Sequence, residues 1–258
     1  YFFRYPSADR EDVPIDKELT EKWLPVDMYI GGQEHAVLHL MYTRFLTMAL
    51  KDIGLIDFDE PFKCFRAHGL IVKDGAKMSK SKGNVVNPDM VVKEYGADAL
   101  RLYEMFMGPL TATKPWNMDG VHGVRGFLDR VWRLIVDERS EELCVNSAIA
   151  DIEPTVEQNR ILHKTIKAVT EDFDSLSFNT AIARMMEFTN FFHKQDSRPK
   201  EAMEQLVLLL APMAPHICEE LWRLLGHTET LAYASWPLYD DSLIQEDTLE
   251  IPVQVKGR

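Results

Sequence analysis

The segment Lys77-Met78-Ser79-Lys80-Ser81-Lys82-Gly83-Asn84 places three lysines, two serines and a glycine within eight residues. It follows the dipeptide Asp74-Gly75, which is typical of a tight hairpin turn. Lysine brings a point charge to phosphate oxygens, and serine hydroxyls and backbone N–H groups add hydrogen bonds. The segment is therefore suited to gripping a polyphosphate, although a solvated basic surface loop is the commoner structure for an arbitrary lysine-rich octamer.

The region before this loop has the pattern of half a nucleotide-binding fold. An apolar run at residues 26–30 ends in Gly31-Gly32 and predicts a buried parallel strand, and residues 65–72 predict the next strand. Residues 34–53 have helical spacing and end at Gly54, with apolar positions that include Val37, Leu38, Met41, Phe45, Met48 and Ala49. A strand, a glycine turn and a helix predict the C-terminal half of a Rossmann-like fold, in which ligands bind at the carboxyl ends of the strands.

The remainder of the chain is predicted to be helical. Helices are expected at residues 17–23, 88–95, 96–107 and 124–136, with loop-like segments at 115–123 and 137–151. From residue 153 onward apolar residues recur at steps of three and four, which predicts three or four amphipathic helices in an antiparallel bundle, with residues 230–236 covering its end. The expected fold class is an α/β Rossmann-like half domain followed by an all-α helical bundle, mostly α overall.

Three segments resemble one family. KMSKS followed by KGN matches the signature loop of class I aminoacyl-tRNA synthetases. Residues 29–40, YIGGQEHAVLHL, resemble the adenylate-binding segment of leucyl-tRNA synthetases, and residues 208–226, LLLAPMAPHICEELWRLLG, resemble the helical tRNA-binding domain of the leucine, isoleucine, valine and methionine enzymes. The resemblance runs from Tyr5 to Trp236, and by it the chain is identified as a member of the leucyl-tRNA synthetase family.

The resemblance also implies how the chain is divided. Residues 1–86 would form the C-terminal half of the Rossmann-like catalytic domain with the lysine loop. Residues 87–118 would form a helical connector against the tRNA stem, and residues 119–240 an α-helical bundle of the anticodon-binding type. Residues 241–258 would begin a truncated C-terminal module, because residues 251–255 alternate like a strand.

In this family leucine is activated with ATP to leucyl-adenylate and then transferred to tRNA(Leu). The resemblance implies that Lys80, assisted by Lys77, contacts the β- and γ-phosphates of ATP. It places Met78 under the adenine and gives Ser79 and Ser81 hydrogen bonds to the nucleotide, while Lys82 is a spectator. Mg²⁺ is expected to arrive with ATP rather than to occupy a protein cage.

The diglycine segment carries the other expected contacts. Gly31 and Gly32 let the backbone approach the nucleotide or simply form a tight turn. Glu34 is implied to accept from the ribose hydroxyls, although an acid is also favoured at a helix N-terminus. His35 and His39 are implied to lie around the adenylate and the leucine side chain. Core histidines are the alternative, and a metal site is not expected, since the order E-H-x-x-x-H lacks a third ligand nearby.

Two further patterns are assigned to structure rather than to binding. His68 and His216 are expected to be structural residues. Arg125, Asp129 and Arg133 recur at steps of four, which predicts an exposed ladder of ion pairs in preference to a track for tRNA phosphates.

Composition limits the possible classes of protein. The 258 residues suffice for two domains, and the apolar content of 46% and charged content of 27% are ordinary for a globular protein. There is no apolar run of membrane-spanning length and no signal-peptide pattern, so no membrane partner is expected. Cys64, Cys144 and Cys218 are widely spaced and odd in number, which favours a reducing cytoplasm.

The net charge of −12 is unusual for a protein that binds nucleic acid. The charge is uneven, however, because residues 63–82 contain six Lys and Arg residues and a single acid, Asp74. A local basic strip can hold RNA on an acidic protein, and the overall charge limits non-specific binding.

Class I synthetases also need a His-x-Gly-His motif, which does not occur here, and the editing insertion is absent too. We therefore expect the chain to act with the N-terminal remainder of the synthetase, and to catalyse little or no ATP–pyrophosphate exchange alone. Two alternatives remain at this point. The chain could be an isoleucyl- or valyl-tRNA synthetase relative, or it could be a non-catalytic tRNA-binding module.

Overall fold

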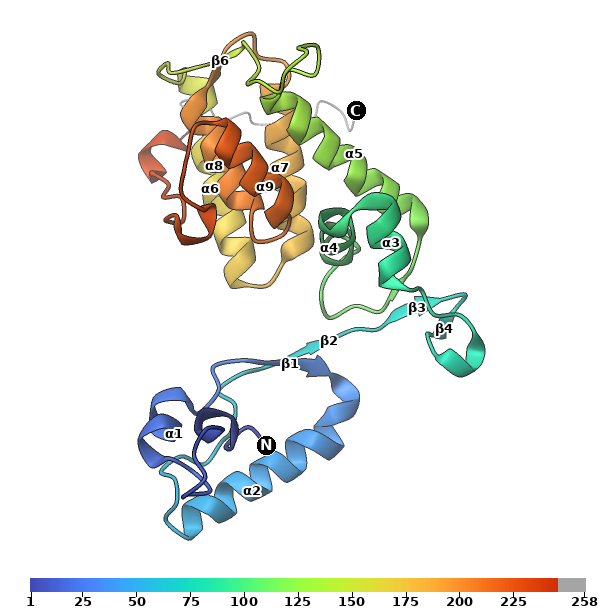
Figure 1. Cartoon of the computed structure of the whole chain (residues 1–258), viewed down its shortest axis with the longest axis vertical. Coiled ribbons are helices and arrows are strands. Elements are labelled where there is room, and N and C mark those ends of the chain that lie inside the picture. Colours follow the sequence, from blue (N-terminus) through green and yellow to red (C-terminus); the bar gives the residue numbers. More distant parts are fainter. Residues whose placement is uncertain (246–258) are drawn as a thin grey trace, which may run out of the picture. The chain divides into compact units, whose positions relative to one another are not determined.

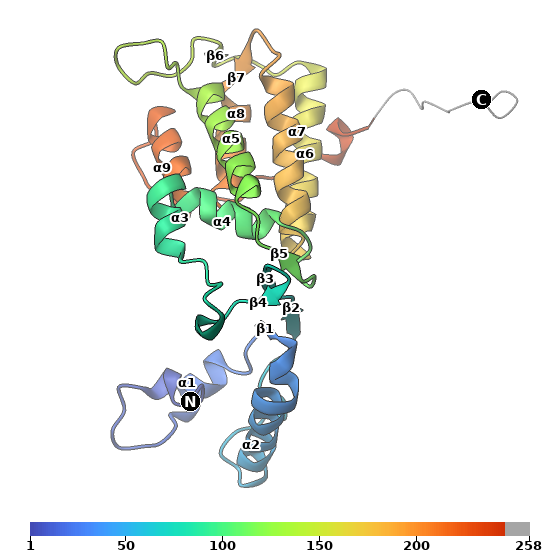
Figure 2. The same ribbon diagram turned by 90° about the vertical axis from the view of Figure 1, so that its right-hand side faces the viewer.

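The computed structural model describes residues 1–245 and divides them into two compact units. Unit 1 consists of Tyr1–Asn84 together with Leu110–Trp116, and unit 2 consists of Val85–Pro109 together with the described residues from Asn117 onward (Figures 1 and 2). The strand expected at residues 251–255, and most of the expected module at 241–258, lie outside the described residues.

The centre of unit 1 is a pair of parallel strands, β1 (Tyr29–Gly32) and β2 (Phe65–His68). Tyr29 is in register with Phe65 and Gly32 with His68, so the strands run side by side over their whole length. The chain between them contains α2 (Met41–Asp52), which closes with Gly54 at a positive φ of 76°. This strand–helix–strand arrangement confirms the half-Rossmann pattern predicted from the sequence.

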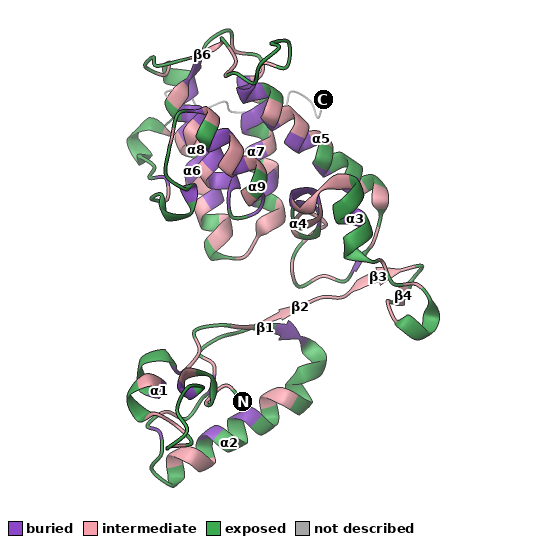
Figure 3. Ribbon diagram, in the orientation of Figure 1, coloured by how far each residue is buried: buried purple, intermediate pink, exposed green. Residues whose placement is uncertain are grey.

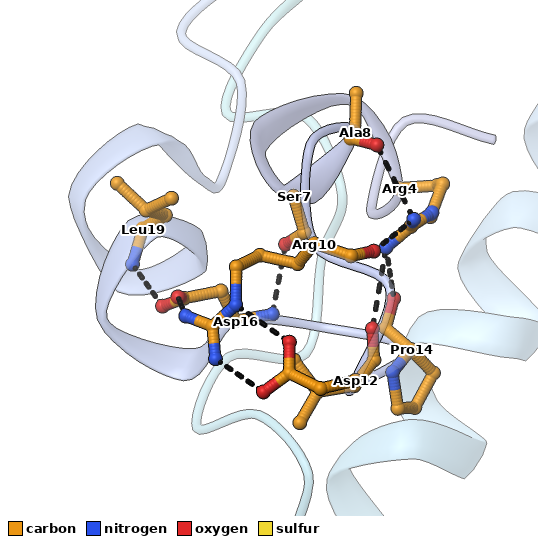
Figure 4. A network of polar contacts seen from close by, with 9 residues as sticks. Arg4, Ser7, Ala8, Arg10, Asp12, Pro14, Asp16 and Leu19 are labelled. Carbon is orange, nitrogen blue, oxygen red and sulfur yellow. Dashed lines mark hydrogen bonds and ion pairs between the residues drawn. The ribbon is translucent and has the colours of Figure 1, made fainter.

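The N-terminal segment of unit 1 is organised by polar contacts around α1 (Lys17–Trp23), whose predicted bounds are confirmed. Asp16 caps this helix by accepting from the Leu19 N–H, and the Arg10 guanidinium bonds both Asp12 and Asp16 (Figure 4). The Arg10 hydrogen bond lowers the pKa of Asp12 to about 2. Because Arg4 also donates to the carbonyls of Ala8, Arg10, Val13 and Pro14, the segment keeps its shape with little apolar core.

The helix expected over residues 34–53 is not one uniform α-helix. A 3₁₀ turn, η2 (Gln33–His35), leads into a π-helical turn, η3 (Ala36–Leu40), before α2 begins. The Thr43 hydroxyl donates to the carbonyls of His39 and Leu40, so a side chain bonds backbone groups where the two helical geometries meet. Wide turns of this kind are frequent at functional sites.

The apolar face of this helical segment is exposed rather than buried. Val37 is 71% exposed and Phe45 is 69% exposed, and the buried positions of α2 are instead Thr43 and Thr47. Figure 3 shows that buried residues gather in helices α5 to α9 and are few along α2. The periodicity predicted the helix correctly, but unit 1 contains no element that covers this face within the described residues.

The strand expected over residues 65–72 is divided in two. After β2 the strand is interrupted at Gly69, and the next strand is β3 (Ile71–Lys73). Strand β3 pairs with β4 (Ala76–Lys77) and with β5 (Lys114–Pro115). A Cβ atom on Gly69 would lie 2.0 Å from the carbonyl oxygen of Ala112, so this glycine permits a close approach of two backbones. Asp74 and Gly75 form the predicted turn, both with positive φ.

Unit 2 is helical. Its N-terminal part is α3 (Pro88–Tyr95), as predicted, and α4 (Ala97–Phe106), which are followed by α5 (Met118–Ile135). Predicting a loop at 115–123 was wrong, because Asn117 caps α5 and the helix already begins at Met118. Gly120 and Gly123 lie inside this helix, although glycine disfavours helix interiors. A Cβ on Gly120 would lie 2.4 Å from the Tyr103 ring, so this glycine serves the packing of α4 on α5.

Four further helices make the bundle of unit 2: α6 (Val156–Asp174), α7 (Phe178–Phe192), α8 (Lys200–Leu210) and α9 (Pro215–Leu224). They lie side by side with α5 (Figures 1 and 2). A capping box between Thr155 and Gln158 begins α6. The segment before α6 and the segment before α8 pair as two short parallel strands, β6 (Ile149–Ala150) and β7 (Arg198–Pro199). No helix among the described residues is long and apolar enough to cross a bilayer.

Two side chains of α4 with opposite charges bond the backbone of the corner between α8 and α9. Asp98 accepts from the backbone N–H groups of His216 and Ile217 at the start of α9, and its Oδ1 lies 2.8 Å from His216 Nδ1. Three residues later, Arg101 donates to the carbonyls of Pro212 and Met213. The carboxylate thus meets the positive end of α9, and the guanidinium bonds carbonyls in the turn after α8. His216 thus contacts Asp98 through both its backbone N–H and its ring.

Candidate active site

The lysine loop and the diglycine corner meet in unit 1. Strand β1 ends at Gly31-Gly32, and Glu34 follows in the next turn. Strand β4 ends at Lys77, whose Nζ lies 3.6 Å from Glu34 Oε1. The structure therefore brings the first lysine of the loop to the Glu34 carboxylate and the two glycines. In the sequence, the lysine follows these three residues by more than forty positions.

The two glycines make room for side chains of their own segment. A Cβ on Gly31 would lie 3.0 Å from the Tyr29 ring, and a Cβ on Gly32 would lie 2.3 Å from a carboxylate oxygen of Glu34. Gly32 has an ordinary φ of −70°, so the requirement is one of space rather than of backbone strain. The missing Cβ of Gly32 thus decides where the Glu34 carboxylate lies.

Electrostatics keep Glu34 ionised. The backbone N–H of Glu34 lowers the pKa of its carboxyl group, and the nearby charges of Lys77 and His35 lower it further. Glu34 can therefore act only as a hydrogen-bond acceptor at neutral pH. The side chains of Lys77 and Glu34 are about two-thirds and one-half exposed, and exposed pairs of this kind contribute little to stability. The ion pair marks proximity but does not by itself hold the loop.

The loop has an internal structure. Lys80–Lys82 form a 3₁₀ turn, and Gly83 follows in the left-handed conformation with φ of 65°. The hydroxyls of Ser79 and Ser81 lie 3.2 Å apart, and Met78 is half-buried, whereas Lys80 and Lys82 are exposed. The Asn84 side-chain amide bonds the backbone at Lys73, Lys77 and Ser79.

His39 lies apart from the Glu34–Lys77 pair, in a cluster of aromatic rings. Its Nε2 is 2.8 Å from the Tyr1 hydroxyl, and its ring is stacked on Tyr1 and tilted against Tyr29 and Phe62. Its Nδ1 is buried without a hydrogen-bond partner among the described residues. Burial lowers the pKa of His39 and keeps the ring neutral, with the charge of His35 adding to the effect. An orphaned ring nitrogen is unusual for a purely structural histidine.

His35 is exposed in the 3₁₀ turn, and no contact between its ring and His39 is observed. No group of three or more His, Cys, Asp or Glu residues within residues 1–245 is placed to hold a metal ion. On α5, Arg125 pairs with Asp129 and also donates to the Tyr95 carbonyl. Arg133 donates to the backbone carbonyl of Asp129 rather than to its carboxylate, so the predicted ladder has one ion pair within these three residues.

Sequence reasoning missed two features of the site. One is the role of Asn84, although an asparagine beside a glycine is a turn signal and asparagine side chains often bond nearby backbone groups. The aromatic cluster around His39 was not predicted. Tyr1, Tyr29 and Phe62 belong to three separate segments. The parallel pairing of β1 with β2, together with the parallel bridge between Val26 and Phe62, brings two of those segments together.

Comparison with known proteins agrees with this geometry. Residues 6–115 match the family model for class I tRNA synthetases (I, L, M and V), and residues 159–256 match the model for the anticodon-binding domain of tRNA ligases. The two models follow one another along the chain, and the first contains both the diglycine corner and the lysine loop. The chain therefore belongs to the class I tRNA synthetase family.

Its similarity within this family is to the leucine branch. The chain is 45% identical over 324 residues to the leucine–tRNA ligase of Rhodopirellula baltica, which covers 100% of this chain and 34% of that protein. Its fold matches LeuRS in the ternary complex of Agrobacterium radiobacter K84 agnB2 LeuRS-tRNA-LeuAMS, with a TM-score of 0.81 and 39% identity over 95% of this chain and 33% of that one. The chain thus spans about a third of the length of each relative.

Proposed function

We propose that this chain is the part of a leucine–tRNA ligase that holds the phosphate end of ATP and carries the helical tRNA-binding domain. The observation that supports this most strongly is the 3.6 Å approach of Lys77 to Glu34, because it joins the lysine loop to the end of β1 in one site. Both relatives named above belong to the leucine enzyme, which favours leucine over isoleucine or valine as the amino acid.

The proposed reaction begins with attack of the leucine carboxylate on the α-phosphate of ATP and departure of pyrophosphate. Such a displacement is accelerated mainly by positioning and by neutralising the negative charge that develops on the leaving group. Lys80 and Lys77 would supply the positive charge that neutralises the leaving group, and both are exposed and able to reach a phosphate chain. Mg²⁺ bound to the phosphates would neutralise further charge.

The residues around the lysines would bind the rest of the nucleotide. Glu34, ionised and acceptor-only, would accept hydrogen bonds from the ribose hydroxyls, and His39 would lie beside the adenylate or the leucine side chain. The other proposed contacts with the nucleotide come from Met78, Ser79 and Ser81 of the lysine loop and from Gly31, Gly32 and His35 at the diglycine corner.

The exposed apolar face of η3 and α2 supports a partner within the same enzyme. Val37, Leu38, Met41 and Phe45 are each more than 60% exposed, and they lie at helical spacing. A continuous apolar surface of this kind is typical of a buried interface. We propose that the N-terminal remainder of the synthetase covers it, that leucine and tRNA(Leu) are the other partners, and that the enzyme works in the cytoplasm.

The test uses a complete ligase that contains this chain, assayed for leucine-dependent ATP–pyrophosphate exchange. We expect Lys80→Ala to lower kcat/KM for ATP by a hundredfold or more, because it removes a charge that neutralises the leaving group. Lys82→Ala is the matched control and is expected to stay within about threefold of the wild type. Exchange that depends on isoleucine or valine rather than leucine, or an equal effect of the two variants, would contradict the proposal.

A further inference from the structure

Asn84 joins the two ends of the lysine loop. Its Oδ1 accepts from the Ser79 N–H at 2.9 Å, and its Nδ2 donates to the carbonyls of Lys73 and Lys77 at 3.4 Å each. Lys73 ends β3 and Lys77 ends β4, so one side-chain amide contacts both strands of the hairpin and the first part of the loop.

The chemistry of these contacts requires an amide. The Ser79 N–H needs an acceptor, and the two carbonyls need a donor, so neither a carboxylate nor an apolar side chain can serve all three. Gly83 turns the chain back through its left-handed conformation, which places the Asn84 side chain under the loop that precedes it. Asn84 is also the last residue of unit 1 before the chain enters unit 2.

No other described contact fixes the loop as directly. The Lys77–Glu34 ion pair is exposed, and the Ser79–Ser81 contact lies within the loop itself. The lysine side chains are long and flexible, so their reach is defined only if the backbone that carries them is held. The backbone at Ser79, directly before Lys80, is held by Asn84.

We infer that Asn84 is a positioning residue, whose side-chain amide holds the lysine loop in the conformation that receives the phosphates of ATP. This inference rests on the function proposed above for the same site. When a loop is competent in only a fraction of molecules, the apparent affinity of its ligand falls by that fraction. Loss of the amide should therefore weaken binding of ATP and leave binding of leucine unchanged.

The first measurement does not depend on activity. Lys77, Lys80 and Lys82 are exposed, so limited trypsin digestion followed by mass spectrometry reports how often the loop opens. In the complete ligase we expect Asn84→Ala to be cleaved within the loop at least fivefold faster than the wild type. Asn84→Asp keeps the acceptor for the Ser79 N–H but loses both donated bonds, and we expect an intermediate rate.

The second measurement separates positioning from a general loss of structure. For Asn84→Ala we expect the KM for ATP in the exchange reaction to rise fivefold or more, while the KM for leucine stays within twofold. A variant that merely unfolds in part would lose active enzyme and would leave both KM values unchanged. The matched control is Asn87→Ala, which removes the capping bond to the Asp89 N–H of α3 and should change neither KM nor the cleavage of the loop.

Two outcomes overturn the inference: loop cleavage of Asn84→Ala at the wild-type rate, or faster cleavage with an unchanged KM for ATP. A wild-type complete protein without leucine-dependent exchange would contradict the proposed function instead. In that case the cleavage rates alone would still decide whether Asn84 holds the loop.

Discussion

Gly32 shows how one absent methyl group shapes a site. A Cβ atom here would overlap the Glu34 carboxylate, which is the flexible end of a side chain and can move away. We therefore expect Gly32→Ala to leave the melting temperature within about 2 °C of the wild type, since the backbone conformation at this position suits any residue. The displaced carboxylate should raise the KM for ATP of the complete ligase severalfold. A large fall in melting temperature without a change in KM would contradict this account.

His39 should make stability depend on pH. Burial holds its pKa below the ordinary value of 6.5, so the folded chain favours the neutral ring. The stability that depends on the neutral ring is fully present above pH 6.5, and it is lost as the pH falls from 6.5 through the lower pKa of the folded state.

We expect NMR titration of the imidazole to show a His39 pKa below 6.5, and urea unfolding between pH 7.5 and 5 to show a weaker pH dependence for His39→Gln than for the wild type. The unchanged tyrosine and phenylalanine rings of the cluster serve as an internal control for the fold. A His39 pKa at or above 6.5 would show that the ring is not sheltered from water.

At the level of the elements, helix α5 offers a matched pair of glycines. Gly123 has open space where a Cβ would point, so Gly123→Ala should stabilise the helix by about 0.5–1 kcal/mol. A Cβ on Gly120 would lie 2.4 Å from the Tyr103 ring, so Gly120→Ala should separate α4 from α5 and destabilise unit 2 by about 1–3 kcal/mol. Urea unfolding followed by circular dichroism tests both. Opposite signs are expected, and equal signs would show that helix propensity alone governs this position.

The same two glycines show why part of the fold could be predicted from the sequence and part could not. Local signals sufficed where the chain interacts with itself nearby: α1 and α3 have the predicted bounds, and Asp74–Gly75 form the predicted turn. Residues 115–123, which include Gly120, were predicted as a loop, whereas the structure shows that Gly120 lies inside α5 and leaves room for the Tyr103 ring of α4. Packing between elements overrides local propensity in such cases.

In the candidate site, too, local features could be predicted from the sequence and contacts between distant segments could not. Local spacing and the family resemblance were enough to name the diglycine corner, Glu34 and the lysine loop, and the structure brings Glu34 and Lys77 together. Two things escaped prediction. One is the pairing of β3 with β5, which joins residues 71–72 to residues 114–115. The other is the π-helical turn that carries His39, because its geometry depends on contacts that no sequence period encodes.

At the scale of the whole molecule, the three cysteines report on burial in both units. Cys64 in unit 1 and Cys144 in unit 2 are exposed, whereas Cys218 on α9 is buried, and burial raises the pKa of its thiol well above the ordinary value. With a thiol reagent at pH 8 we expect two cysteines to react quickly and Cys218 to react only when the bundle opens.

The core residue Phe188 provides the control for that interpretation. Phe188 is 1% exposed, so Phe188→Ala should destabilise the bundle by about 3–5 kcal/mol and speed the reaction of Cys218 by about a hundredfold or more. The rates at Cys64 and Cys144 should stay the same. Labelling of Cys218 as fast as the other two in the wild type would show that the bundle is not closed in solution.

The two-stranded sheet of unit 1 has a practical consequence for anyone who produces this chain alone. Among the described residues, no third strand pairs with either outer edge of β1 and β2, and Ile30 and Phe65 on these strands are 52% and 37% exposed. Unprotected edges of this kind recruit strands from neighbouring molecules. Concentrated samples of the isolated polypeptide should therefore self-associate, with light scattering that grows with concentration, and dilute conditions or a solubilising fusion will be needed for biophysical work.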